Sequence, residues 1–164
     1  MSLTTAAAFS AAAAQTAADD FKYTDEQFAD IQMLRYRVEG FEKLTLKEKT
    51  FIYYLQEAAL QGRDILFDQN GRYNLRIRRM LEKVYTDYKG DRASADWQGF
   101  VTYLKRFWFS SGPHHHYGCE KFEPGFSEQW LRNALVDINY EEATCVPRTA
   151  CGKSWEELLP VIFD

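Results

Sequence analysis

The chain has 164 residues, of which 46% are apolar and 16% aromatic, and this composition excludes an intrinsically disordered protein. Its 20 Lys and Arg and 24 Asp and Glu give a net charge of −4, so composition offers no broad basic surface for nucleic acid or acidic membranes. Polar residues interrupt every apolar run well before the roughly 20 residues that span a bilayer. Length and composition therefore predict one globular unit with a sizeable core.

Residues 1–20 differ from the rest of the chain. They form an alanine-rich apolar run without Lys or Arg, followed by the acidic pair Asp19-Asp20. This order is typical of the second half of a secretory signal peptide, with an A-x-A-like cleavage site near residues 12–14. We expect a truncated signal peptide or a disordered tail outside the fold, and an exported or periplasmic protein, with a cytoplasmic location as the alternative.

From residue 21 to 164 the apolar residues recur with a period near 3.6, which predicts an all-α fold. Thr24-Asp-Glu-Gln27 has the form of a capping box and predicts a helix running through Leu34. Thr45-Leu-Lys-Glu48 predicts a second helix in the same way. Small and apolar residues share one stripe of that second helix, so we expect it to be central in the packing: Phe51, Leu55, Ala58, Ala59 and Gly62.

Three more helices are expected in the middle of the chain. A turn at Asp68–Gly71 precedes a helix from Leu75 to Tyr88, and Ser94 and Ser127 begin two further helices. The aromatic residues of the Ser94 helix are predicted to be core: Trp97, Phe100, Tyr103, Phe107, Trp108 and Phe109. A basic cluster is interpreted as a solvated, ion-paired helix face and not as a phosphate site: Arg72, Arg76, Arg78 and Arg79.

The last residues end on an apolar run. Ser154-Trp-Glu-Glu157 has the capping-box form and predicts a helix that carries Leu158 to Phe163, followed only by Asp164. Such a surface requires a partner, so we expect residues 21–164 to be the N-terminal part of a longer protein. The three cysteines are Cys119, Cys145 and Cys151. A Cys145–Cys151 disulfide is possible in an exported protein, although nothing in the sequence requires one.

Residues 110–125, SSGPHHHYGCEKFEPG, are rich in Gly and Pro and predict an irregular loop. This loop contains all three histidines of the chain, His114, His115 and His116, beside Tyr117. Three interpretations compete: a metal site of His114 and His116 with Cys119 or Glu120, imidazoles that satisfy backbone groups of the loop, and a ligand-contacting loop. Residue spacing favours the last two over the metal site but does not separate them from each other.

The sequence contains no G-x-S-x-G, no phosphate-binding glycine loop and no H-E-x-x-H, and no cysteine has a recognisable His/Asn partner set. We therefore expect no catalytic residue and no metal ligand within these 164 residues.

The stretch from Val101 to Phe126, VTYLKRFWFSSGPHHHYGCEKFEPGF, resembles the N-terminal region of the dipeptidyl peptidase III family of zinc exopeptidases, especially its bacterial branch. In that branch a "WF-x-N-G-x-HHHY-x-x-x-KF-x-P-x-F" stretch occurs. Tyr53–Ile65, YYLQEAALQGRDI, resembles the family's "YYL-x-x-A-A-x-x-G" helix, and Leu158–Asp164 resembles a further bacterial segment. Ser111 and Pro113 depart from the pattern, in which Asn and an aliphatic residue are usual.

The resemblance implies a two-lobed enzyme that releases dipeptides from the N-termini of peptides. It implies that this chain is helical scaffold of the lower lobe, inactive alone, and that the zinc motif His-Glu-x-x-Gly-His lies in the other lobe of the same polypeptide. Tyr117 matches the aromatic residue that the family places against the N-terminal side chains of the peptide, and His116 matches its neighbour in that subsite. The alternative is a self-contained helical module that binds a peptide or another partner without catalysis.

Overall fold

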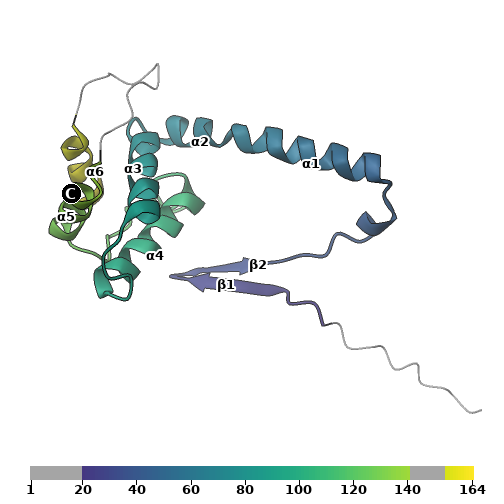
Figure 1. Cartoon of the computed structure of the whole chain (residues 1–164), viewed down its shortest axis with the longest axis horizontal. Coiled ribbons are helices and arrows are strands. Elements are labelled where there is room, and N and C mark those ends of the chain that lie inside the picture. The colour runs from purple at the N-terminus through teal and green to yellow at the C-terminus, as the bar shows by residue number, and fades with distance from the viewer. Residues whose placement is uncertain (1–19, 141–153) are drawn as a thin grey trace, which may run out of the picture.

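The computed structural model describes residues 20–140 and 154–164 (Figure 1). Within these ranges the chain is mostly helical, and no helix in them is long and apolar enough to cross a membrane. The signal-peptide prediction for residues 1–19 and the predicted pairing of Cys145 with Cys151 lie outside the described residues. The helices are α1 (Leu46–Gln61), α2 (Arg63–Asn70), α3 (Asn74–Asp87), α4 (Ala95–Ser110), α5 (Glu128–Asp137) and α6 (Leu159–Phe163), with short 3-10 turns η1 (Phe41–Lys43) and η2 (Trp155–Leu158).

The all-α prediction is wrong at the first predicted helix. Residues 24–34 form an antiparallel hairpin of β1 (Thr24–Phe28) and β2 (Ile31–Leu34), in which Phe28 pairs with Ile31. Ala29 makes the tight turn with a φ of 47°. Acidic residues of the hairpin pair with α4: Glu26 with Lys105, and Asp30 with Arg106. Apolar residues spaced three apart are compatible with a helix face and also with a tight hairpin. The ion pairs with Lys105 and Arg106, which lie far along the chain, favour the hairpin.

The hydrophobic core lies between α3, α4, α5 and the C-terminal segment η2–α6. The core positions of α3 and α4 follow the predicted period of 3.6, and Phe100, Leu104 and Phe107 of α4 are fully buried. The α4 aromatics pack on rings from other elements: Trp97 stacks on Tyr88 at 5.1 Å between centroids, and Phe100 meets Trp130 at 5.3 Å. The predicted aromatic core is thus confirmed for four residues, Trp97, Phe100, Tyr103 and Phe107. Trp108 is half-buried against this core, and the prediction is wrong for Phe109, which is 47% exposed.

The helix starts predicted at Thr45, Ser94 and Ser127 are confirmed, whereas the start predicted at Ser154 is that of a 3-10 turn. Thr45 forms a reciprocal capping box with Glu48, and the side chains of Ser94 and Ser127 each accept a backbone hydrogen bond three residues along the chain. Ser154 caps η2 by accepting from the N–H of Glu156. The predicted turn at Asp68–Gly71 is shorter than expected, because α2 remains helical to Asn70.

The apolar run at the end of the chain is not a surface, contrary to the prediction. Leu158, Leu159 and Ile162 are 0–1% exposed, and the Phe163 ring packs edge-on against Phe126 at 5.6 Å. These side chains complete the core formed by α3, α4 and α5.

The predicted central position of the second helix is also wrong in this chain. None of the residues of α1 is buried. Figure 1 shows α1 and α2 extending as an arm away from the cluster of α3, α4 and α5. The arm exposes large apolar side chains along its length: Phe51, Ile52, Tyr53, Tyr54, Leu55, Leu60, Ile65 and Leu66.

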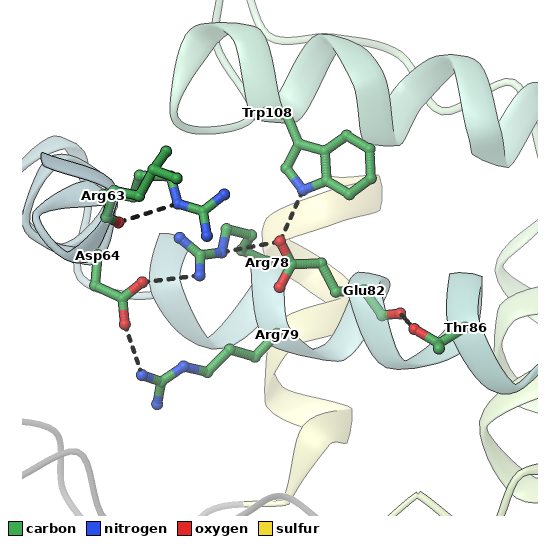
Figure 2. A network of polar contacts seen from close by, with 8 residues as sticks. Arg63, Asp64, Arg78, Arg79, Glu82, Thr86 and Trp108 are labelled. Atoms are coloured by element: carbon green, nitrogen blue, oxygen red, sulfur yellow. Dashed lines mark hydrogen bonds and ion pairs between the residues drawn. The ribbon is translucent and has the colours of Figure 1, made fainter. Parts of the chain in front are cut away.

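A polar network joins the arm to the core (Figure 2). The carboxylate of Asp64 in α2 accepts from Arg78 at 2.8 Å and from Arg79 at 2.9 Å, both in α3. Arg78 also pairs with Glu82, whose carboxylate accepts from the Trp108 indole of α4 at 2.9 Å. The ion-paired face is therefore confirmed at Arg78 and Arg79. The prediction of a solvated face is wrong at Arg78, whose side chain is 11% exposed, and at Arg76, which is buried with its guanidinium near the Tyr73 ring.

Candidate functional site

The 110–125 loop begins at a fixed point on the core. Ser111 ends α4 in the left-handed conformation, with a φ of 55°. The buried Asn74 of α3 donates its side-chain N–H to the Ser111 carbonyl at 3.1 Å, and Gly112 packs against the same Asn74 amide. The N–H of the buried Phe122 then returns to the Pro113 carbonyl at 2.8 Å. Both ends of the loop are therefore anchored to the helical core.

Between these anchors the loop folds back on itself. His114 and Lys121 form an antiparallel bridge, and the His115 N–H donates to the Glu120 carbonyl at 2.7 Å. The Cys119 N–H donates to the His115 carbonyl at 3.1 Å, and Cys119 adopts a φ of 62°. Residues 115–120 thus make a tight turn whose tip carries His116, Tyr117 and Gly118.

The imidazole of His115 points into this turn. Its Nδ1 accepts from the backbone N–H of Tyr117 at 3.2 Å and of Gly118 at 3.0 Å. The structural interpretation of the histidines, as groups that satisfy loop backbone, therefore applies to His115.

His116 and Tyr117 point outward. Tyr117 is 85% exposed, the His116 side chain is also exposed, and their rings lie 4.3 Å apart between centroids. Phe109, from the last turn of α4, meets the His116 ring edge-on at 5.0 Å. We call Phe109, His116 and Tyr117 the aromatic patch. Sequence reasoning identified the last two and missed Phe109, because all the α4 aromatics were assigned to the core.

The metal interpretation of the loop finds no supporting geometry. Within residues 20–140 and 154–164, no three His, Cys, Asp or Glu side chains come together to hold a metal ion. His114 and His116 consequently do not converge with Cys119 or Glu120, and Cys119 is an exposed free thiol.

The described part of the chain also has an open depression of about 900 Å³. It lies at the C-terminal ends of α3 and α5, and its lining includes Tyr88, Lys89, Arg92 and Asp137. None of its lining residues belongs to the 110–125 loop.

Neither a scan against models of protein families nor a search of curated proteins finds a match to this chain. Functional inference therefore depends on the loop residues and their geometry.

Proposed function

We propose that this chain supplies helical scaffold and a peptide-subsite loop to a zinc-dependent dipeptidyl peptidase like those of the dipeptidyl peptidase III family. In this proposal the chain belongs to the lower lobe, the remainder of the polypeptide provides the upper lobe, and the chain is inactive alone. The observation that carries the proposal is Tyr117, a large aromatic side chain 85% exposed at the tip of an anchored loop.

An exposed aromatic ring on a fixed backbone suits peptide binding. Tyr and His present flat surface with a polar tip, and they lose little conformational freedom on binding because each has only two side-chain torsions. The neighbouring rings of His116 and Phe109 widen this surface. A patch of this kind accepts varied apolar side chains, as a broad-specificity exopeptidase requires.

The backbone at Ser111 also supports the proposal. Bacterial family members usually have Asn at this point of the motif, and Asn adopts the left-handed conformation more readily than other non-glycine residues. The φ of 55° at Ser111 lies in the region that such an Asn adopts readily, which supports the proposal.

The residues described here do not fit the family's zinc. They bring together no suitable ligand set, so the metal ligands would come from the other lobe, and no catalytic step is assigned to this chain.

The test begins with the coding sequence that follows Asp164 in frame. We expect it to encode His-Glu-x-x-Gly-His, and we expect the protein that includes it to release Phe-Phe from the peptide Phe-Phe-Ala-Ala. A stop codon directly after Asp164, or a downstream protein without zinc ligands, overturns the proposal.

In that longer protein Tyr117→Ala is expected to weaken peptide binding by about 1–3 kcal/mol, the scale of a lost aromatic contact, measured as KM for Phe-Phe-Ala-Ala. Tyr36→Ala is the matched control, because Tyr36 is 76% exposed and outside the loop. An unchanged kcat/KM in the Tyr117 variant would remove this residue from the subsite.

The exposed apolar surface of α1 favours a second candidate, a self-contained helical interaction module. This candidate predicts that the 164-residue chain binds a partner saturably without hydrolysing peptides.

A further inference from the structure

We propose that His115 is a positioning residue: its neutral imidazole holds the backbone of Tyr117 and thereby presents the aromatic patch, and protonation of that imidazole releases it. The two hydrogen bonds to Nδ1 carry the inference. The consequence for peptide binding rests on the proposed function, whereas the hold on the turn does not.

The acceptor role of Nδ1 fixes the protonation state of the ring. A nitrogen that accepts needs its lone pair, so the ring is neutral and carries its hydrogen on Nε2. A protonated imidazole has N–H groups on both nitrogens and accepts at neither. It would then direct an N–H at the N–H groups of Tyr117 and Gly118, 3.2 and 3.0 Å from Nδ1, and the turn would have to open.

The contact controls Tyr117 because it acts on the backbone of that residue. The Tyr117 side chain is 85% exposed and is therefore not fixed by burial. Its direction depends on the turn, in which a side-chain acceptor receives the N–H groups two and three residues along the chain. Asn and Asp make the same contact in Asx turns.

Several other groups face His115. Its ring lies 4.5 Å from that of His116, 6.4 Å from that of Tyr117 and 6.4 Å from that of Phe122, measured between centroids. From α4, the Arg106 guanidinium stacks on Phe122 at 4.1 Å. The other titratable groups of the turn are those of His114, Cys119, Glu120 (whose carboxylate lies against Gly118) and Lys121. Because the neighbouring groups include acids and bases that can also respond to pH, the response of His115 is identified by comparing variants.

The first test uses the 164-residue chain and ¹⁵N NMR between pH 5 and 8. We expect an Nε2–H tautomer for His115 at the upper end, and amide shifts of Tyr117 and Gly118 that follow the titration of the His115 ring. His115→Asn keeps an acceptor that does not titrate, so the part of these amide shifts that follows the His115 ring should disappear, and only the contribution of the neighbouring groups should remain. His115→Leu should displace the amide shifts at every pH, and His114→Asn, in an exposed neighbour, should leave the wild-type profile.

An Nδ1–H tautomer, or amides of Tyr117 and Gly118 that are the same in wild type and His115→Leu, overturns the proposal. If His115→Leu fails to fold, the pH response of His115→Asn decides the question alone.

The second test uses the longer peptidase and the peptide Phe-Phe-Ala-Ala. We expect His115→Leu to raise KM about fivefold with little change in kcat, and His115→Asn to restore KM to within about twofold. If Tyr117→Ala raises KM and His115→Leu does not, the positioning role is wrong. If neither variant changes KM although the NMR contact is present, the proposed function fails and His115 holds only the turn.

Discussion

Ser111 has a left-handed backbone conformation that Asn adopts more readily than Ser. It ends α4 with a φ of 55°, and its carbonyl accepts from Asn74, so the conformation is fixed by its neighbours. Asn adopts this region at lower cost than Ser. We expect Ser111→Asn to raise the free energy of unfolding by about 0.5 kcal/mol in urea denaturation. Ser127→Asn is the control, since Ser and Asn are equivalent at a helix N-cap, and a lower stability of the Ser111 variant would contradict the strain argument.

Tyr103 presents a buried hydroxyl in an aromatic setting. It is 2% exposed, its Oη has no hydrogen-bond partner among the described residues, and burial raises the pKa of the phenol. Removing an unpaired buried hydroxyl removes its desolvation cost and leaves the ring packing intact. Tyr103→Phe should therefore raise the free energy of unfolding by about 0.5–1 kcal/mol, measured by denaturant titration. Tyr117→Phe, at an exposed site, should change nothing, and a destabilised Tyr103 variant would reveal a bound partner for that hydroxyl.

At the scale of elements, the attachment of α2 to α3 depends on one carboxylate. Burial opposes the charged form of Asp64, but hydrogen bonds and charges from Arg79 and Arg78 outweigh it and hold the pKa of Asp64 below its ordinary value. The folded state therefore gains stability from Asp64 above the unfolded-state pKa of about 3.9, and this gain is lost as pH falls through the lower folded-state pKa.

We expect Asp64→Asn to cost about 1 kcal/mol at pH 7, a modest figure because water screens the half-exposed carboxylate. The free energy of unfolding should be measured against pH for both proteins. The difference between the variant and wild type should shrink below the pKa of an ordinary carboxyl group and vanish below the lowered pKa of Asp64. Asp68→Asn is the matched control, because Asp68 lies in α2 and makes no ion pair within the described ranges. A difference that persists unchanged at low pH would show that the charge of Asp64 is not responsible.

The elements that were predictable from sequence are those fixed by local contacts. Thr45, Ser94 and Ser127 bond to backbone three residues away, so the signal and its cause lie in the same short stretch. The hairpin at Thr24–Leu34 depends instead on Lys105 and Arg106, far along the chain. No Asn-Gly or similar turn signal marks it, because its turn residue is Ala29.

The same distinction applies to the candidate site. Gly and Pro predicted that residues 110–125 form a loop, and that prediction is confirmed. Residue spacing could not separate the roles of His115 and His116, because adjacent imidazoles differ only in the direction that the turn gives them, and only the family resemblance singled out His116.

At the scale of the whole molecule, a buried core is joined to a helical arm that is exposed. The core of α3 to α6 buries most of its apolar residues, whereas α1 is exposed along its full length, with Phe51 63% and Leu55 53% exposed. Large apolar side chains exposed along one helix are typical of a protein-interaction surface or of an aggregation-prone one. We therefore expect the 164-residue chain to bind a hydrophobic dye such as anilinonaphthalene sulfonate in its folded state.

Charges placed on the arm should reduce this binding without weakening the core. Phe51 and Leu55 lie one turn apart in α1, and neither is buried, so Phe51→Glu with Leu55→Glu should roughly halve the dye fluorescence and leave Tm unchanged. Gln56→Glu is the control, because it adds charge to the exposed face of the same helix without removing apolar surface. Dye fluorescence that stays at the wild-type level in the double variant would mean that Phe51 and Leu55 do not belong to the dye-binding surface, and a fall in Tm would mean that α1 is packed in solution.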